Sequence, residues 1–113
     1  MKDSKLKFDL EERTYEFARS TREYVKSLPK NITNHKYSDQ LVRSSGSVGA
    51  NYIEANESLG KKDLLLRLRI SKKEAKESRF WLRLTEPEAD AMITKEGLIR
   101  ESLFGFVSIL GFR

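Results

Sequence analysis

Residues 38–58 read SDQLVRSSGSVGANYIEANES, and this stretch decides the fold because its apolar and small side chains recur with the spacing of an α-helix. On a helix that turns about 100° per residue they form two stripes. One stripe consists of Tyr37, Leu41, Val48, Tyr52, Ala55 and Leu59, and the other of Val42, Gly46, Gly49 and Ile53. A helix that is apolar or small over nearly half of its circumference is expected to touch two neighbouring helices.

The two glycines of the second stripe are unusual, because two glycines inside a helix cost about 2 kcal/mol relative to alanine. Residues 46–49 lack the spacing and the Lys-[Ser/Thr] pair of a phosphate-binding loop, and no strand precedes them. We therefore expect Gly46 and Gly49 to be positions where a neighbouring helix approaches closely.

Three further amphipathic segments, about residues 9–28, 61–85 and 94–110, are also expected to be helices. In the first of them Asp9 and Glu12 have the spacing of a capping box, and Pro29 ends the segment. Its predicted core stripe consists of Leu10, Phe17, Thr21, Tyr24 and Leu28.

The links between these segments are short. Residues 29–37 are expected to be a loop with His35 exposed, Gly60 to end the second helix, and Glu86-Pro87 to end the third. Because short links place consecutive helices antiparallel, the sequence predicts one all-α domain over residues 1–113, an up-down-up-down four-helix bundle.

The composition of the 113 residues limits the chemistry of this chain. It has no cysteine and one histidine, which excludes disulfides, zinc sites built on sulfur and sites with several histidines. We therefore expect no metal, no cofactor and no enzymatic activity. The N-terminal residues Met-Lys-Asp-Ser-Lys contain no apolar run, and no stretch is long enough to span a membrane, so a cytoplasmic location without membrane contact is expected.

Positive charge is concentrated on the third segment. Residues 61–83 hold nine Lys and Arg against three Asp and Glu, a net charge of +6, whereas the whole chain has a net charge of +5. Eight of the cations fall within an arc of about 120°, namely Lys61, Lys62, Arg69, Lys72, Lys73, Lys76, Arg79 and Arg83. Such an arc is either a solvated face, a surface for an acidic protein, or a track for the phosphates of a nucleic acid.

A polar stripe follows the second segment. It contains Gln40, Arg43, Ser47, Asn51, Glu54 and Ser58, and Glu77 of the third segment is expected to lie opposite. We interpret Gln40, Arg43, Ser47, Asn51, Glu54 and Glu77 as an interhelical polar network that fixes the register of the helices. The alternative is a charged pair of Arg43 and Glu54 inside a pocket.

The chain also has more large apolar side chains than a small monomer can bury. The third segment carries two apolar stripes, and Phe104 and Phe112 lie off the main stripe of the fourth segment. We therefore expect an interface between copies of the chain that contains Phe80, Trp81, Phe104 and Phe112.

The middle of the chain resembles a known family. Residues 40–55, QLVRSSGSVGANYIEA, are similar to the signature Q-L-x-R-S-x-x-S-[IV]-G-A-N-[IY]-x-E of the four helix bundle proteins encoded in 23S rRNA intervening sequences. Lys61-Lys62-Asp63-Leu64, Ala75, Glu77 and Trp81-Leu82 resemble the second block of that family. Ala55 departs from the glycine that many members carry after the glutamate.

The resemblance implies a left-handed four-helix bundle that assembles into a homopentamer, and it implies no enzymatic activity. Related accessory proteins of diversity-generating retroelements are basic pentamers that bind nucleic acid and a reverse transcriptase. From this we expect an oligomeric accessory protein that binds the backbone of RNA or DNA, with a reverse transcriptase or another acidic protein as a further partner. The alternative is an oligomeric scaffold or protein-interaction module that binds no nucleic acid.

Overall fold

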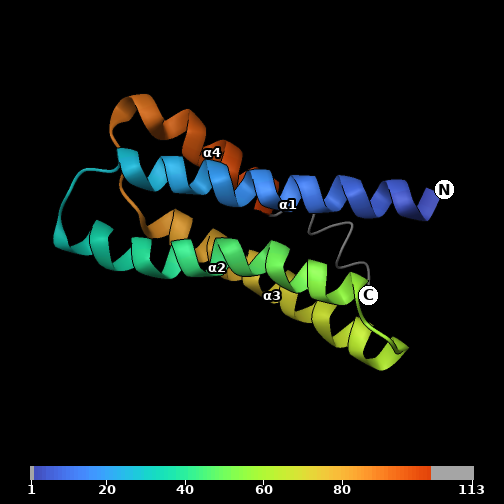
Figure 1. Ribbon diagram of the computed structural model, residues 1–113. Coiled ribbons are helices and arrows are strands. Elements are labelled where there is room, and N and C mark those ends of the chain that lie inside the picture. Colours follow the sequence, from blue (N-terminus) through green and yellow to red (C-terminus); the bar gives the residue numbers. More distant parts are fainter. Residues whose placement is uncertain (1, 103–113) are drawn as a thin grey trace.

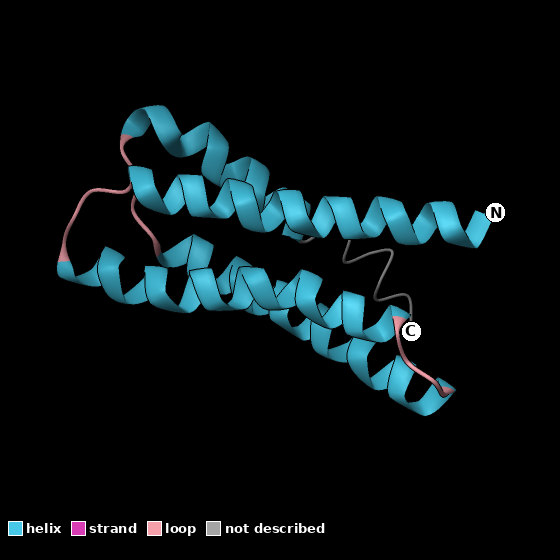
Figure 2. Ribbon diagram, viewed as in Figure 1, coloured by secondary structure: helices cyan, strands magenta, loops and turns pink. Residues whose placement is uncertain are grey.

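The computed structural model describes residues 2–102, with side chains from residue 9 onwards, and these residues form four α-helices (Figure 1). The helices are α1 (Lys2–Ser27), α2 (Ile32–Asn56), α3 (Lys61–Leu84) and α4 (Met92–Arg100), with a short 3₁₀ helix, η1 (Ala89–Ala91), before α4. The described part of the chain contains helices and loops but no strand (Figure 2). The expected all-α, four-helix architecture is therefore confirmed.

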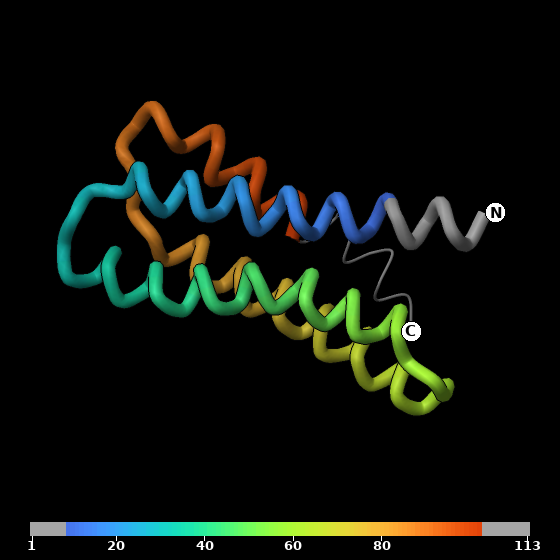
Figure 3. The backbone as a smooth tube through the Cα atoms, viewed as in Figure 1, coloured from blue at the N-terminus to red at the C-terminus, as the bar shows by residue number. Residues whose placement is uncertain are grey.

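Consecutive helices lie side by side and run antiparallel (Figure 3). α2 makes its most extensive contact with α3 and a second contact with α1, as its two small and apolar stripes predict. α4 packs against both α1 and α3. The helices therefore follow one another around the bundle, and α1 and α3 occupy opposite corners.

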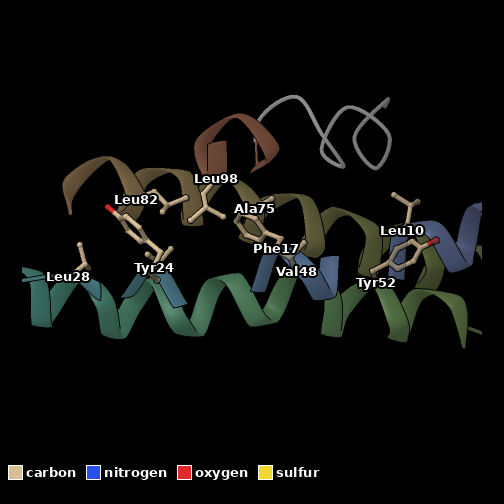
Figure 4. Close-up of a cluster of buried hydrophobic side chains, with 10 residues drawn as sticks. Leu10, Phe17, Tyr24, Leu28, Val48, Tyr52, Ala75, Leu82 and Leu98 are labelled. Atoms are coloured by element: carbon tan, nitrogen blue, oxygen red, sulfur yellow. The ribbon is translucent and has the colours of Figure 1, made fainter. Parts of the chain in front are cut away.

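The core runs along the length of the bundle, and every helix contributes to it (Figure 4). The predicted stripe of α1 is buried in full, and on α2 Leu41, Val48, Tyr52 and Ala55 are buried. α3 contributes Ala75 and Leu82, and α4 contributes Leu98. Not every expected packing residue is buried: Leu59 follows the end of α2 and is fully exposed, and Val42 and Ile53 are half-exposed.

Hydroxyl groups line the contact between α2 and α3. Ser44 and Ser78 are fully buried and their hydroxyl oxygens lie 2.9 Å apart, and Ser71 donates a 2.7 Å hydrogen bond to the carbonyl of Val48. Small side chains let the two helix backbones approach closely, and because each of these hydroxyls bonds to a neighbour, none of them is buried without a partner.

Glycine plays a packing role at one of the two expected positions. A Cβ atom placed on Gly49 would lie 2.9 Å from the hydroxyl oxygen of Thr14, so Gly49 is where α1 comes close to α2. A Cβ atom on Gly46 would meet nothing within 4 Å. No described helix of the same chain therefore approaches Gly46 closely, and the predicted close contact at this position is wrong.

α1 begins earlier than expected. It starts at Lys2, so Asp9 lies inside the helix and does not cap it. Residues 2–8 contain no glycine or proline that would stop a helix. The spacing of a capping box also occurs inside helices, so it could not locate the true start.

α2 also begins earlier, and residues 32–37 are helical rather than a loop. The side-chain oxygen of Asn31 accepts a 2.9 Å hydrogen bond from the backbone N–H of Asn34 and caps this helix. His35 is exposed as expected, although it lies on the helix.

The buried side chain of Asn34 joins the two chain connections at one end of the bundle. Its amide nitrogen donates to the carbonyls of Pro29, at 3.1 Å, and Glu86, at 3.0 Å. Its amide oxygen accepts a 2.9 Å hydrogen bond from the backbone N–H of Glu86. All three hydrogen bonds require residue 34 to sit in the first turn of α2.

The opposite end of the bundle is less tightly packed. α2 ends at Asn56, and Gly60 is the N-cap of α3. The expectation that Gly60 ends α2 is therefore wrong. Residues 61–70 of α3 contain no buried side chain, and the first buried side chain of α3 is that of Ser71.

The last predicted helix is described only in part. α4 begins at Met92, two residues before the predicted start, and residues 103–110 of the predicted segment lie outside the described residues.

Candidate nucleic-acid interface

The outer face of α3 carries the eight cations that the sequence placed on one arc, and we call these residues the α3 strip. The opposite face of α3 points into the core and carries its buried residues, Ser71, Ala75, Ser78 and Leu82. Lys61, Lys62, Arg69, Lys73, Lys76 and Arg83 are exposed, whereas Lys72 and Arg79 are half-buried. The strip extends over about 33 Å, because 22 residues separate its ends at about 1.5 Å each.

Most charges of the α3 strip have no acidic partner. Among the described side chains, no carboxylate lies within ion-pair distance of seven strip residues, namely Lys61, Lys62, Arg69, Lys73, Lys76, Arg79 and Arg83. The carboxylates of α3 bind cations outside the strip. Asp63 lies 4.0 Å from Arg67, and Glu74 and Glu77 bind Arg43 of α2. The positive charges of the strip therefore add to one another and attract polyanions.

By contrast, the cations of α1 whose side chains the structure describes lie beside carboxylates. Arg19 lies 2.7 Å from Glu16, and Arg22 lies 3.0 Å from Glu23. The hydrogen bond from Arg22 and the nearby charge of Lys26 lower the pKa of Glu23, and the hydrogen bond to Glu16 raises the pKa of Arg19. Uncompensated positive charge in the described part of the bundle is thus concentrated on α3.

The polar network between α2 and α3 centres on Arg43. Its guanidinium donates to Glu77 at 2.7 Å and to Glu74 at 3.3 Å, so the expected contact with Glu77 is present. Glu74, which the sequence analysis did not include, is the more buried carboxylate, with 12% of its side chain exposed. Arg43 retains 49% exposure, so this network lies at the surface and not in a pocket.

The network continues along α2 through backbone carbonyls. Ser47 donates to the carbonyl of Arg43 at 3.0 Å, and Asn51 donates to the carbonyl of Ser47 at 2.9 Å. Arg67 of α3, which the sequence analysis also missed, donates to the side chain of Asn51 at 3.4 Å.

Two predicted members do not join the network. Gln40 and Glu54 are exposed, and neither side chain forms a hydrogen bond or ion pair with another described side chain. The alternative pair of Arg43 and Glu54 is wrong, because eleven residues separate them by about 16 Å along one helix. A helical wheel shows that residues share a face but not how far apart they lie along the axis.

An aromatic row crosses from α2 to the α3 strip. Tyr37 stacks on Trp81 with ring centres 6.0 Å apart, and Phe80 meets Trp81 edge-on at 5.0 Å. Phe80 is 53% exposed, and Trp81 is half-buried. Phe104 and Phe112, the other two residues expected at an interface between copies, lie outside the described residues.

The aromatic row borders an open hollow of about 700 Å³ on the outer side of α3. Its lining consists of Arg69, Lys72, Lys73, Lys76, Glu77, Arg79, Phe80 and Trp81. Five cations therefore line the same hollow as the two aromatic rings, and Glu77, the one acid in the lining, is held by Arg43.

A second exposed apolar surface lies between α1 and α2. We call it the α1–α2 face, and it consists of Tyr15, Val42, Gly46 and Ile53. Tyr15 is 58% exposed, and with Val42 and Gly46 it lines a second hollow together with Arg19 and Arg22. The sequence analysis expected Val42 and Ile53 to contact a helix of the same chain, whereas both are half-exposed.

The described residues show no metal centre and no membrane helix. They include no group of three or more His, Asp or Glu side chains that could hold a metal ion. None of the described helices combines the length and apolar character that crossing a bilayer requires.

The fold and the site together define a small, all-helical bundle protein with one strongly cationic outer helix. The chain belongs to the 23S rRNA-intervening sequence protein family, since the model of that family matches residues 7–96. This match confirms the resemblance seen in the sequence.

A solved structure has a similar fold along almost its entire length. It is the crystal structure of a protein of unknown function from the S23 ribosomal protein family of Bacteroides thetaiotaomicron, with a TM-score of 0.73 and 26% sequence identity. The similarity covers 92% of this chain and 93% of that one. No curated protein shows a significant match to this chain.

Proposed function

We propose that this protein is a non-enzymatic, oligomeric accessory protein that binds the sugar–phosphate backbone of RNA or DNA along the α3 strip. The observation that carries the proposal is the row of exposed cations that no described carboxylate neutralises. Phosphates match such a row, whereas a merely solvated face usually mixes charges of both signs. Binding of this kind reads little sequence, because phosphate contacts carry no base information.

Self-association supports this function by multiplying weak contacts. Each chain has a net charge of +5, so the homopentamer that the family resemblance implies would carry about +25. Several strips that engage one nucleic acid raise the apparent affinity well above that of a single chain.

The polar network supports a structural rather than a catalytic role. Glu77 and Glu74 are engaged by Arg43, and Glu54 lies three turns away from Arg43 along α2. Ion pairing of both carboxylates with one arginine supports the proposal that this network holds α2 against α3.

The first test replaces three exposed strip residues, Lys73, Lys76 and Arg83, by Glu. This changes the formal charge from +5 to −1 per chain. We expect RNA and DNA binding at low salt to be lost, because each reversal replaces a phosphate contact by repulsion. Binding is measured by fluorescence anisotropy across a salt series, and circular dichroism should show unchanged helix content.

A matched control reverses three exposed cations outside α3, namely Lys30, Lys36 and Arg100. Its net charge is the same, so binding that depends on the strip should persist in this variant. Equal loss in both variants would mean that only total charge matters, and unchanged binding in the strip variant would show that the strip is the wrong surface.

A second candidate function is a scaffold that assembles through its apolar surface and binds an acidic protein instead of nucleic acid. The exposed α1–α2 face favours this reading, because apolar patches of this kind mark association surfaces. Wild-type protein that assembles but shows no salt-dependent binding to RNA or DNA would support it.

A further inference from the structure

We propose that Phe80 is a stacking platform for an unpaired base, so that the α3 strip prefers single-stranded or looped nucleic acid to an uninterrupted duplex. This inference rests on the proposed function and names the kind of nucleic acid that the strip binds.

Phe80 lies within the row of cations rather than beside it. Lys76 precedes it by four residues and Arg83 follows it by three, so both cations are its neighbours on the helix surface. Half of the ring is exposed to solvent. Proteins that bind single strands combine these two elements, since cations hold the phosphates while an aromatic ring stacks on a base.

Its neighbours fix the orientation of the ring. The edge-on contact with Trp81 has an interplanar angle of 76°, and Trp81 is itself stacked on Tyr37. A ring that is already held in place loses less conformational entropy when a base stacks on it.

The surroundings of Phe80 favour a nucleic acid over a second copy of this chain. The centres of protein–protein interfaces are poor in lysine, whereas Lys73 and Lys76 line the same hollow as Phe80. An isologous contact, in which two copies met through this same surface, would bring like charges together. At the α1–α2 face the nearby Arg19 and Arg22 are paired with glutamates, so contact between copies brings no such penalty there.

Charge alone makes the opposite prediction about the nucleic acid. A duplex has a higher charge density than a single strand, so a surface that only binds phosphates should favour the duplex. A preference for the single strand therefore requires contacts to bases.

The test compares a single-stranded oligonucleotide with a blunt duplex of equal phosphate number at one low salt concentration. We expect the wild type to bind the single strand about tenfold more tightly, because stacking is lost in the duplex. Phe80→Ala should reduce single-strand affinity to that of the duplex or below it without affecting duplex binding, and Phe80→Tyr should retain the preference. Leu66→Ala, at another half-exposed residue of α3 outside the strip, is the control and should change nothing.

Trp81 provides an independent signal, because it is the one tryptophan of the chain. A base stacked on Phe80 would lie close to the indole, so the single strand should quench its fluorescence more than the duplex does.

The outcomes separate the two proposals. If neither nucleic acid binds, the proposed function fails. If both bind equally and Phe80→Ala has no effect, the strip stands and the stacking role is refuted. If Phe80→Ala lowers the molecular mass in light scattering while leaving the single-strand preference intact, Phe80 belongs to the interface between copies, and the stacking role is again refuted.

Discussion

A single buried amide, that of Asn34, holds together three chain segments at one end of the bundle. It connects the first turn of α2 to the link after α1 and to the link after α3. Each of its three hydrogen bonds involves a backbone group, so the contact depends on the path of the chain more than on the identity of its neighbours. Loss of this side chain would leave two carbonyls and one N–H without their partner.

We expect Asn34→Ala to lower the free energy of unfolding by roughly 2–4 kcal/mol, because three hydrogen bonds are lost and their partners remain partly buried. Asn34→Asp keeps the acceptor but loses both donors, and it should be at least as unstable. Chemical denaturation measures both variants. Lys36→Ala, at an exposed neighbour on the same helix, should stay within 0.5 kcal/mol of the wild type, since surface changes are usually that small. An Asn34→Ala variant as stable as this control would contradict the role of the amide.

The sequence could not reveal the role of Asn34. Asparagine is common in loops, and the polar residues around Asn34 predicted a loop, so the sequence did not indicate that this side chain is buried. The start of α2 could have been predicted from the pattern Pro29-x-Asn31, because Asn31 is a favourable N-cap two residues after a proline that ends the preceding helix. The partner at Glu86 is 52 residues away and follows only from the fold.

At the scale of the helices, one close contact between α1 and α2 fixes how the two helices meet. Thr14 is buried, its hydroxyl donates to the carbonyl of Glu11, and Gly49 faces it from α2. The space at Gly49 is too small for a methyl group unless Thr14 moves.

We expect Gly49→Ala to destabilise the protein by about 1 kcal/mol, because overpacking outweighs the gain in helix propensity. Adding Thr14→Ala should restore stability, since it removes the hydroxyl that a new Cβ would meet at 2.9 Å. Gly97→Ala is the control on α4, where a Cβ would meet nothing within 4 Å, and it should stabilise by up to about 1 kcal/mol. Thermal denaturation of the wild type and the three variants tests this, and equal effects at Gly49 and Gly97 would contradict it.

Helical spacing predicted the number of helices and most of their buried faces, because burial against neighbours repeats with the turn of the helix. It did not predict where α1 and α2 begin, because the start of a helix depends on a few local hydrogen bonds. It also could not pair Arg43 with Glu74, because partners on different helices depend on how the helices are aligned along the bundle. The α3 strip could be read from the sequence because all its members lie on one helix.

At the scale of the whole molecule, two exposed surfaces differ in charge. The α1–α2 face is apolar with its nearby cations neutralised, and the α3 strip lies on the helix that occupies the corner opposite α1. Assembly through the first surface would leave the second one accessible.

We expect the double substitution Val42→Glu and Ile53→Glu to convert the proposed oligomer into single chains of 13.1 kDa without loss of helix content. New charges at a desolvated interface oppose association, whereas both positions are half-exposed in the single chain. Light scattering and circular dichroism measure the two effects. Leu59→Glu combined with Ile93→Glu changes two exposed apolar residues outside this face and should leave the mass unchanged. Assembly that survives the first pair would rule out the α1–α2 face.

The contrast between the two ends of the bundle has a mechanical consequence. Where the Asn34 amide joins the links, the helices are tied by buried hydrogen bonds, whereas the first ten residues of α3 bury no side chain. The apolar side chains of this segment are at most half-buried, although Leu68 packs against the core, so local opening there exposes less apolar surface than opening of the part of α3 that buries Ala75 and Leu82. Lys61 and Lys62 lie in the first turn of α3, where fraying of the helix would move them relative to the cations from Lys73 onwards and adjust them to the curvature of a ligand.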